Sequence, residues 1–154
     1  MNNQGLLAAS AIALAAACVP MVFPLSYTGY IVSMAFWGMA FGGFWMLIAP
    51  AMADVIDGIV AKTGRRDDGV YLGFRAFFGR LAWLVQAVAF AVVHELTGFA
   101  ANPRSARAVF GIRLHQAAIP AVLLLVGYVV FKSLNTITPE SARLNRELMK
   151  RKGW

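Results

Sequence analysis

Hydrophobic and polar positions alternate along this chain in long blocks. Four apolar blocks stand out, at residues 6–23, 30–53, 76–98 and 114–131. Each holds about the 20 mostly apolar residues that a helix needs to cross a bilayer. The pattern therefore predicts an all-α fold, a polytopic membrane protein with four transmembrane helices over residues 1–134. Residues 135–154 would form a basic tail outside the membrane.

The composition agrees with this fold class. Of the 154 residues, 60% are hydrophobic and 14% are charged, and the mean hydropathy is +0.66. Soluble domains carry about 45–50% apolar and about 25% charged residues. The one cysteine, Cys18, lies in an apolar block, which excludes an internal disulfide. Residues 1–5 hold no lysine or arginine, so the first block is interpreted as a span and not as a cleaved signal peptide.

The basic residues are distributed unevenly between the two sides that four spans would define. Eleven of the fourteen fall on the side of the chain ends: Lys62, Arg65, Arg66, Arg75, Arg80, Lys132, Arg143, Arg146, Lys150, Arg151 and Lys152. Only Arg104, Arg107 and Arg113 fall on the other side. The positive-inside rule then predicts an inner-membrane protein with both termini in the cytoplasm. The tail, with Thr138 as its cap, is predicted to be a basic amphipathic helix on the inner leaflet, with disorder as the alternative.

Small residues recur every four positions in the first two spans. They are Ala9, Ala13 and Ala17, and then Gly38 and Gly42. Such rows let helix backbones approach closely inside a bilayer. We therefore expect these two rows to pack against other helices.

Few polar side chains lie within the spans. Gln86 and Trp83 fall on one face of the third span and are candidates for lining a solute pathway. The alternative role of Gln86 is a hydrogen bond to a neighbouring helix. His94 and Glu95, near the end of that span, are interpreted as interfacial, with a proton relay as the alternative.

The segment 54–75 is the densest charged stretch in the first half of the chain and is predicted to be a cytoplasmic loop. Asp54 and Asp57 fall on one helical face, and Arg65 and Arg66 are available as partners on the same side. One hypothesis is a salt-bridged loop that joins two spans and gates a transport pathway. The alternative is a solvated segment whose exposed ion pairs contribute only about 0–1 kcal/mol each.

The order of residues in this segment resembles a known family. The match comprises Ala53-Asp54-x-x-Asp57, Thr63-Gly64-Arg65-Arg66-Asp67-Asp68-Gly69-x-Tyr71-x-Gly73 and Phe77-Phe78-Gly79-Arg80-Leu81, with further matches at Gly111-Ile112-Arg113-Leu114, Ile119-Pro120-Ala121 and Thr138-Pro139-Glu140. These motifs are similar to those of the glycoside–pentoside–hexuronide:cation symporters, the melibiose-carrier branch of the major facilitator superfamily. Asp68 stands where the family commonly has glutamate.

The resemblance implies that the chain corresponds to the last four spans of a two-bundle transporter. The family's cation-binding carboxylates lie in the other bundle, so the site for a coupling cation, Na⁺ or H⁺, would not be in this chain. The implied partners are therefore the missing N-terminal bundle or other membrane subunits, the lipid bilayer, and a small polar solute such as a sugar. The family roles that carry over are those of cytoplasmic gate and conformational coupling, at Asp54, Asp57, Arg65, Arg66 and Tyr71.

Two functions follow as hypotheses. The first is a partial cation:sugar or glycoside symporter, not competent alone. The alternative is a non-transporting membrane scaffold or assembly protein. An enzyme is not expected, because the sequence contains no nucleophile–base set, metal-ligand cluster or phosphate-binding loop. No cofactor, metal site or nucleic-acid partner is predicted.

Overall fold

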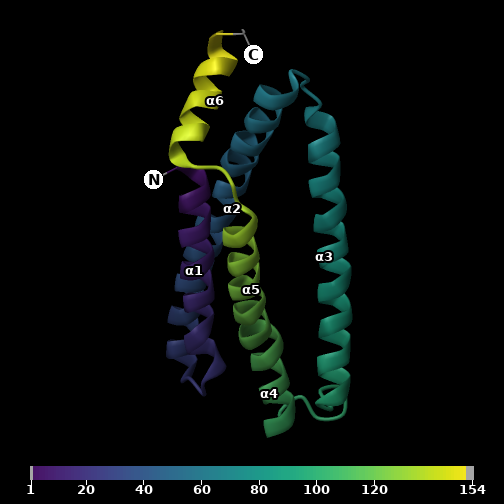
Figure 1. The fold of residues 1–154 in the computed structure, drawn as a ribbon. Coiled ribbons are helices and arrows are strands. Elements are labelled where there is room, and N and C mark those ends of the chain that lie inside the picture. Colours follow the sequence, from purple (N-terminus) through teal and green to yellow (C-terminus); the bar gives the residue numbers. More distant parts are fainter. Residues whose placement is uncertain (1, 152–154) are drawn as a thin grey trace.

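The computed structural model describes residues 2–151 and consists of helices joined by short connections (Figure 1). In chain order the helices are α1 (Asn3–Val22), α2 (Tyr27–Thr63), α3 (Asp68–Leu96), α4 (Ala106–Arg113), the π-helical η1 (Leu114–Ala118), α5 (Ile119–Leu134) and α6 (Pro139–Arg151). Four of the described helical segments are long and apolar enough to cross a membrane: α1, α2, α3 and the continuous α4–η1–α5 segment. The predicted fold class is confirmed.

Helices α1, α2 and α5 form the packed part of the bundle. Asn2 caps α1 by accepting a hydrogen bond from the Gly5 amide at 2.9 Å. The buried face of α1 consists of Gln4, Ala11, Leu14, Ala15, Cys18 and Met21. The two predicted rows of small residues do not form these helix contacts. Ala9 and Ala13 are exposed, and Gly38 and Gly42 have no described atom within 4 Å of the position a Cβ would take.

Helix α2 is much longer than a membrane crossing requires. At 1.5 Å per residue its 37 residues extend to about 56 Å, whereas the hydrocarbon core is about 30 Å thick. The predicted 54–75 loop is therefore wrong in its bounds, since α2 continues to Thr63 and α3 begins at Asp68. Charged residues are tolerated in this part of α2 because it extends beyond the apolar layer. Gly64, at φ 68°, ends the helix and donates its amide to the Val60 carbonyl at 2.8 Å.

The fourth span begins at Ala106, earlier than the predicted residue 114. Ser105 caps it by accepting from the Ala108 amide at 3.1 Å. The π-helical turn lies immediately before Pro120. Proline cannot donate to the carbonyl four residues before it, and the wider turn accommodates this loss inside a continuous helix.

Helix α3 stands apart from the other spans (Figure 1). None of its residues is buried, and it contacts α4 and η1 near its C-terminal end. There a Cβ on Gly111 would overlap the Thr97 side chain, so the two helices touch closely at one point. Most of α3 is uncovered by the described part of the chain.

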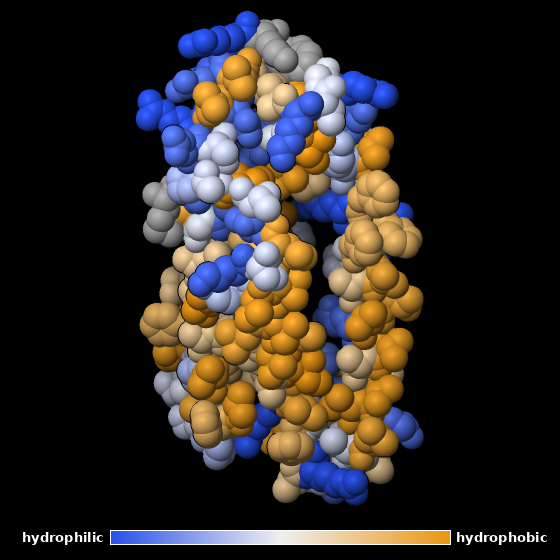
Figure 2. All heavy atoms as spheres, in the orientation of Figure 1, coloured by the Kyte–Doolittle hydropathy of each residue, from blue (hydrophilic) through white to orange (hydrophobic). Residues whose placement is uncertain are grey.

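Helix α6 packs against the extended end of α2. Thr138 caps it, as expected, by accepting from the Ser141 amide at 3.1 Å. The buried positions of α6 are Ala142 and Met149, while Leu144 stays exposed. Figure 2 shows hydrophilic residues gathered around α6 and the α2–α3 turn, and hydrophobic residues over the spans. We call this end of the molecule the charged end. Lys152 lies outside the described residues.

Candidate functional site

The charged end is organised around one buried carboxylate. Asp54 is 2% exposed, and its Oδ1 atom accepts hydrogen bonds from Arg146 Nη2 at 2.8 Å and Nε at 3.1 Å. Arg146 belongs to α6, and its side chain is 48% exposed. The ion pair therefore joins α2 to α6, across 92 positions of sequence.

Apolar contacts support this ion pair. Ile56 and Val60 of α2 pack with Met149 of α6, and Tyr71 of α3 lies half-buried against the same cluster. Gly58 permits the approach, because a Cβ there would lie 3.3 Å from the Asn145 side chain. Tyr71 is thus brought to the part of α2 that carries Asp54.

Three carboxylate groups at the charged end have an oxygen without a partner in the described chain: Asp54, Asp57 and Asp68, the last through its buried Oδ1. Asp54 Oδ2 is buried and has no hydrogen-bond partner within residues 2–151. Asp57, one turn further along α2, is half-buried and forms no ion pair with any described residue. An unpaired buried oxygen is energetically costly, so a further donor here would be stabilising.

Arg65 and Arg66 do not pair with Asp54 or Asp57. They form short-range pairs within the α2–α3 turn, Arg65 with Asp67 at 3.6 Å and Arg66 with Asp68 at 3.0 Å. All four side chains are at least 38% exposed. The hypothesised bridge from Arg65 and Arg66 to the acidic pair is therefore absent, and their exposed pairs match the alternative of a solvated segment. The donor is Arg146, which the sequence analysis placed only in the tail.

A second region of interest is the space between α3 and the α2–α5 pair, visible as an opening in Figure 2. It has a volume of about 710 Å³, and its polar wall comes from Gln86 of α3 and from His115 and Gln116 of η1. Trp37 of α2 also lines it. Trp83 does not line it and is 72% exposed, so the structure does not bring Trp83 and Gln86 together.

Gln116 was missed by the sequence analysis. Its Oε1 accepts a hydrogen bond from Tyr30 Oη at 2.9 Å, and its Nε2 lies 3.4 Å from Met34 Sδ. The available signal was a glutamine inside a span, the same signal that identified Gln86. This bond crosses from η1 to α2 and places a polar group beside the interior space.

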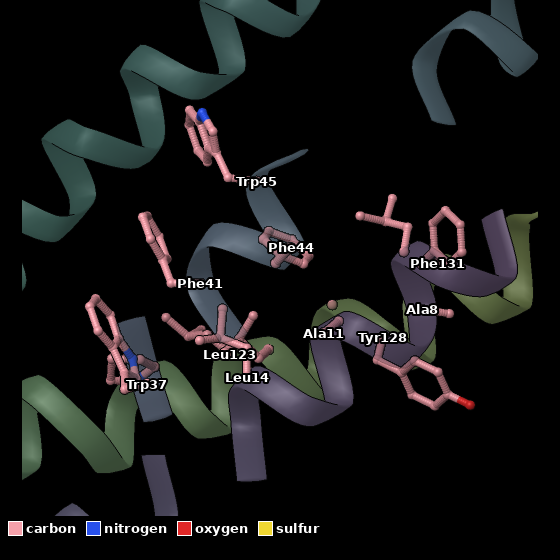
Figure 3. Close-up of a pocket in the computed structure, with 14 residues that line it drawn as sticks. Ala8, Ala11, Leu14, Trp37, Phe41, Phe44, Trp45, Leu123, Tyr128 and Phe131 are labelled. Atoms are coloured by element: carbon pink, nitrogen blue, oxygen red, sulfur yellow. The ribbon is translucent and has the colours of Figure 1, made fainter. Parts of the chain in front are cut away.

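An apolar cavity of about 510 Å³ lies between α1, α2 and α5 and shares Trp37, Pro120 and Leu123 with this space (Figure 3). Trp37, Phe41 and Trp45 form a ladder along α2, with ring centroids 5.1 and 6.0 Å apart. Trp37 borders both spaces. The ladder thus leads from the polar interior towards the charged end.

The other end of α3 carries an aromatic cluster. The His94 and His115 rings lie 5.9 Å apart, and Phe90 packs against both. Glu95 is exposed and lines a different, shallow groove with Ala91, Val92 and Leu96. Within residues 2–151 no group of three or more His, Cys, Asp or Glu side chains is placed to hold a metal ion.

Comparison with known proteins identifies one relationship. A family model described as MFS/sugar transport protein matches residues 2–135, which is all four spans. No curated protein and no solved structure matched the chain significantly.

Proposed function

We propose a function from the premise that the chain belongs to the MFS/sugar transport protein family. Membership indicates a sugar transporter-type, multi-pass membrane protein and not an enzyme. Our proposal is that the chain forms part of a secondary transporter that moves a sugar or glycoside together with a cation, Na⁺ or H⁺. We place the chain in the glycoside–pentoside–hexuronide:cation symporter branch, where it corresponds to the last four spans of a complete transporter.

The observation that carries the proposal is the interior space beside α3. Its volume of about 710 Å³ suits a small ligand, since such sites typically measure about 300–1,000 Å³. Gln86 and Gln116 offer amide donors and acceptors, and Trp37 offers a flat apolar face. Hydroxyl groups and the apolar face of a sugar ring match these two kinds of wall.

The same space supports the proposal that the chain does not transport alone. One side is formed by α3, which has no buried residue, and the described helices leave the space open. Alternating access needs two bundles that move around a central site. We infer that a further helical bundle, on another polypeptide or another part of a longer one, completes the site and supplies the cation ligands.

The charged end is the proposed gate and the proposed cytoplasmic side. Asp54 is fixed to Arg146, while the exposed pairs of Arg65 and Arg66 can exchange partners at little cost. Asp57 and the free oxygen of Asp54 would receive donors from the second bundle in one state of the cycle. Tyr71 would couple this exchange to α3, because it packs against the α2–α6 cluster.

Uptake measurements test the proposal. Proteoliposomes that contain only this chain should show no cation-driven uptake of labelled disaccharides above that of empty liposomes. Co-reconstitution with the completing bundle should produce uptake that needs a Na⁺ or H⁺ gradient. Robust coupled uptake by the chain alone would refute the partial-transporter proposal. Absence of uptake in every complete assembly would favour a scaffold.

The gate has its own test in the active assembly. Reversing both charges in Arg65→Glu/Arg66→Glu should lower the uptake rate at least tenfold. The matched variant Arg104→Glu/Arg107→Glu makes the same charge change at the opposite end and should lower it less than about threefold. Equal effects of the two variants would remove the case for a gate at the charged end.

A further inference from the structure

A basic groove lies at the charged end, where α6 passes the start of α1. It has a volume of about 430 Å³ and is lined by Asn2, Pro139, Arg143, Arg146, Glu147 and Lys150. Figure 1 shows the beginning of α6 beside the N-terminal end of the chain. This basic groove is separate from the interior space beside α3 and shares Arg146 with the proposed gate.

The groove has an excess of positive charge. Arg143, Arg146 and Lys150 recur at three- and four-residue steps and share one face of α6. Glu147 forms an ion pair with Arg143 at 3.2 Å, and Asp54 forms one with Arg146 from the α2 side. Lys150 has no ion pair with the rest of the described chain. One positive charge is therefore left over, which suits a ligand carrying a single negative charge.

A second groove adjoins the first and shares Asn2 and Pro139 with it. Its volume is about 280 Å³, and its further walls combine apolar or largely apolar residues with polar ones: Gly5, Ala8, Tyr128, Phe131 and Ile137, and Gln4, Lys132 and Asn135. Lys132 Nζ lies 6.0 Å from the centre of the Tyr128 ring, at the outer limit of a cation–π contact. The two grooves together offer a cationic compartment beside one with mixed apolar and polar walls.

The grooves lie at the depth where lipid headgroups meet acyl chains. Helix α1 begins at Asn3 and has 20 residues, or about 30 Å, which is just enough to cross the hydrocarbon core. Asn2 therefore marks the boundary of the apolar layer. Lys132 is near the end of α5, which crosses the same layer and finishes at Leu134.

We propose that the two grooves together bind one anionic phospholipid. Arg143 and Lys150 hold the phosphate, and Tyr128 and Phe131 contact the glycerol and the first part of an acyl chain. The phosphodiester charge matches the one excess positive charge of the basic groove, and Lys132 of the second groove adds a further cation beside it. The bound lipid would brace α6 against the start of α1, independently of whether the chain transports a sugar.

Lipid titration monitored by native mass spectrometry tests this site on the purified full chain. Phosphatidylglycerol should bind at least tenfold more tightly than phosphatidylcholine with the same acyl chains. The variant Arg143→Gln/Lys150→Gln should weaken phosphatidylglycerol binding roughly 30-fold, because each basic residue near an anionic lipid surface contributes about a fivefold gain in affinity. The Asp54–Arg146 pair stays intact in this variant, so α6 should remain docked, and an unchanged melting temperature would verify this.

The control variant is Arg66→Gln/Arg151→Gln, which removes the same charge at the same end but outside both grooves. It should weaken binding less than threefold. An equal loss in this control would reduce the site to general surface charge and overturn the proposal. Equal binding of the two lipids, or displacement of phosphatidylglycerol by an equal concentration of inorganic phosphate, would also overturn it.

Discussion

Helices α1 and α3 are both apolar enough to cross a membrane, but the protein covers them differently. In the most apolar stretch of α1, 28% of the residues are buried, whereas none is buried in that of α3. The buried face of α1 uses small side chains such as Ala11, Ala15 and Cys18. Helix α3 instead exposes large ones, including Phe77 and Trp83.

The difference teaches that apolarity and packing are separate properties of a span. Lipid is as apolar as a helix surface, so association in a bilayer depends on close approach and on polar contacts. Helix α1 has both, since Gln4 also donates to the Ala51 carbonyl of α2 at 2.7 Å. Within the described chain, helix α3 makes contacts only near its two ends, with Tyr71 against the α2–α6 cluster at one end and Thr97, its C-cap, against Gly111 at the other. Each prediction below sets a change in the packed part against a matched change on the α3 side.

The largest effect is expected at the buried ion pair. Arg146→Ala leaves the Asp54 carboxylate buried without a partner. It should cost roughly 2–3 kcal/mol, below the about 3–5 expected of a fully buried pair, because the Arg146 side chain is half exposed. Arg66→Ala breaks the exposed pair at the start of α3 and should cost less than about 1 kcal/mol. Unfolding in detergent would measure both, and equal costs would contradict a structural role for Asp54–Arg146.

The next effect tests the small-residue packing of α1. Ala15→Leu adds three carbons where Ala15 is 4% exposed, and such overpacking typically costs about 1–3 kcal/mol. Ala87→Leu makes the same change at an exposed position of α3 and should stay within about 0.5 kcal/mol. Thermal melting in one detergent would compare the two variants. A large loss in Ala87→Leu would show that another chain covers this face of α3 in the sample.

The sequence was sufficient to predict the fold class and to assign most basic residues to one end of the molecule, because block length and composition decide whether a helix can cross a bilayer. It also identified the Thr138 cap, which depends on local chemistry. The bounds of α2 were wrong because a helix that leaves the membrane can continue in water. Charged residues after Ala53 therefore marked the membrane boundary and not the helix end.

The partner of Asp54 was not predictable in the same way. The nearest arginines in sequence, Arg65 and Arg66, pair instead with aspartates two residues further on. Arg146 reaches Asp54 only because α6 turns back onto α2, which depends on the apolar contacts of Met149. The prediction that a row of alanines on α1 packs against another helix was wrong for a related reason. Alanines occur on several faces, and only the partner helices select the face with Ala11 and Ala15.

A smaller effect is expected where α3 meets the rest of the bundle. Gly111→Ala places a methyl group against Thr97 and should push α3 away from α4, at a cost of about 1–2 kcal/mol. Gly127→Ala lies in the same span with no described atom within 4 Å, so it should be neutral or slightly stabilising. Distances between spin labels on α3 and α5 would report the displacement. Unchanged distances in Gly111→Ala would mean that α3 is held elsewhere.

The smallest effect separates the two intramembrane amides. Gln116→Leu removes the acceptor of the Tyr30 hydroxyl and should cost about 1 kcal/mol. Gln86→Leu removes no hydrogen bond to the described chain and should change stability by less than about 0.5 kcal/mol. If a further bundle completes the interior space, the ranking should change in the assembly, where Gln86→Leu would lose a partner that the isolated chain lacks. A cost above 1 kcal/mol for Gln86→Leu in the isolated chain would instead mean that α3 closes onto η1 and satisfies this amide internally.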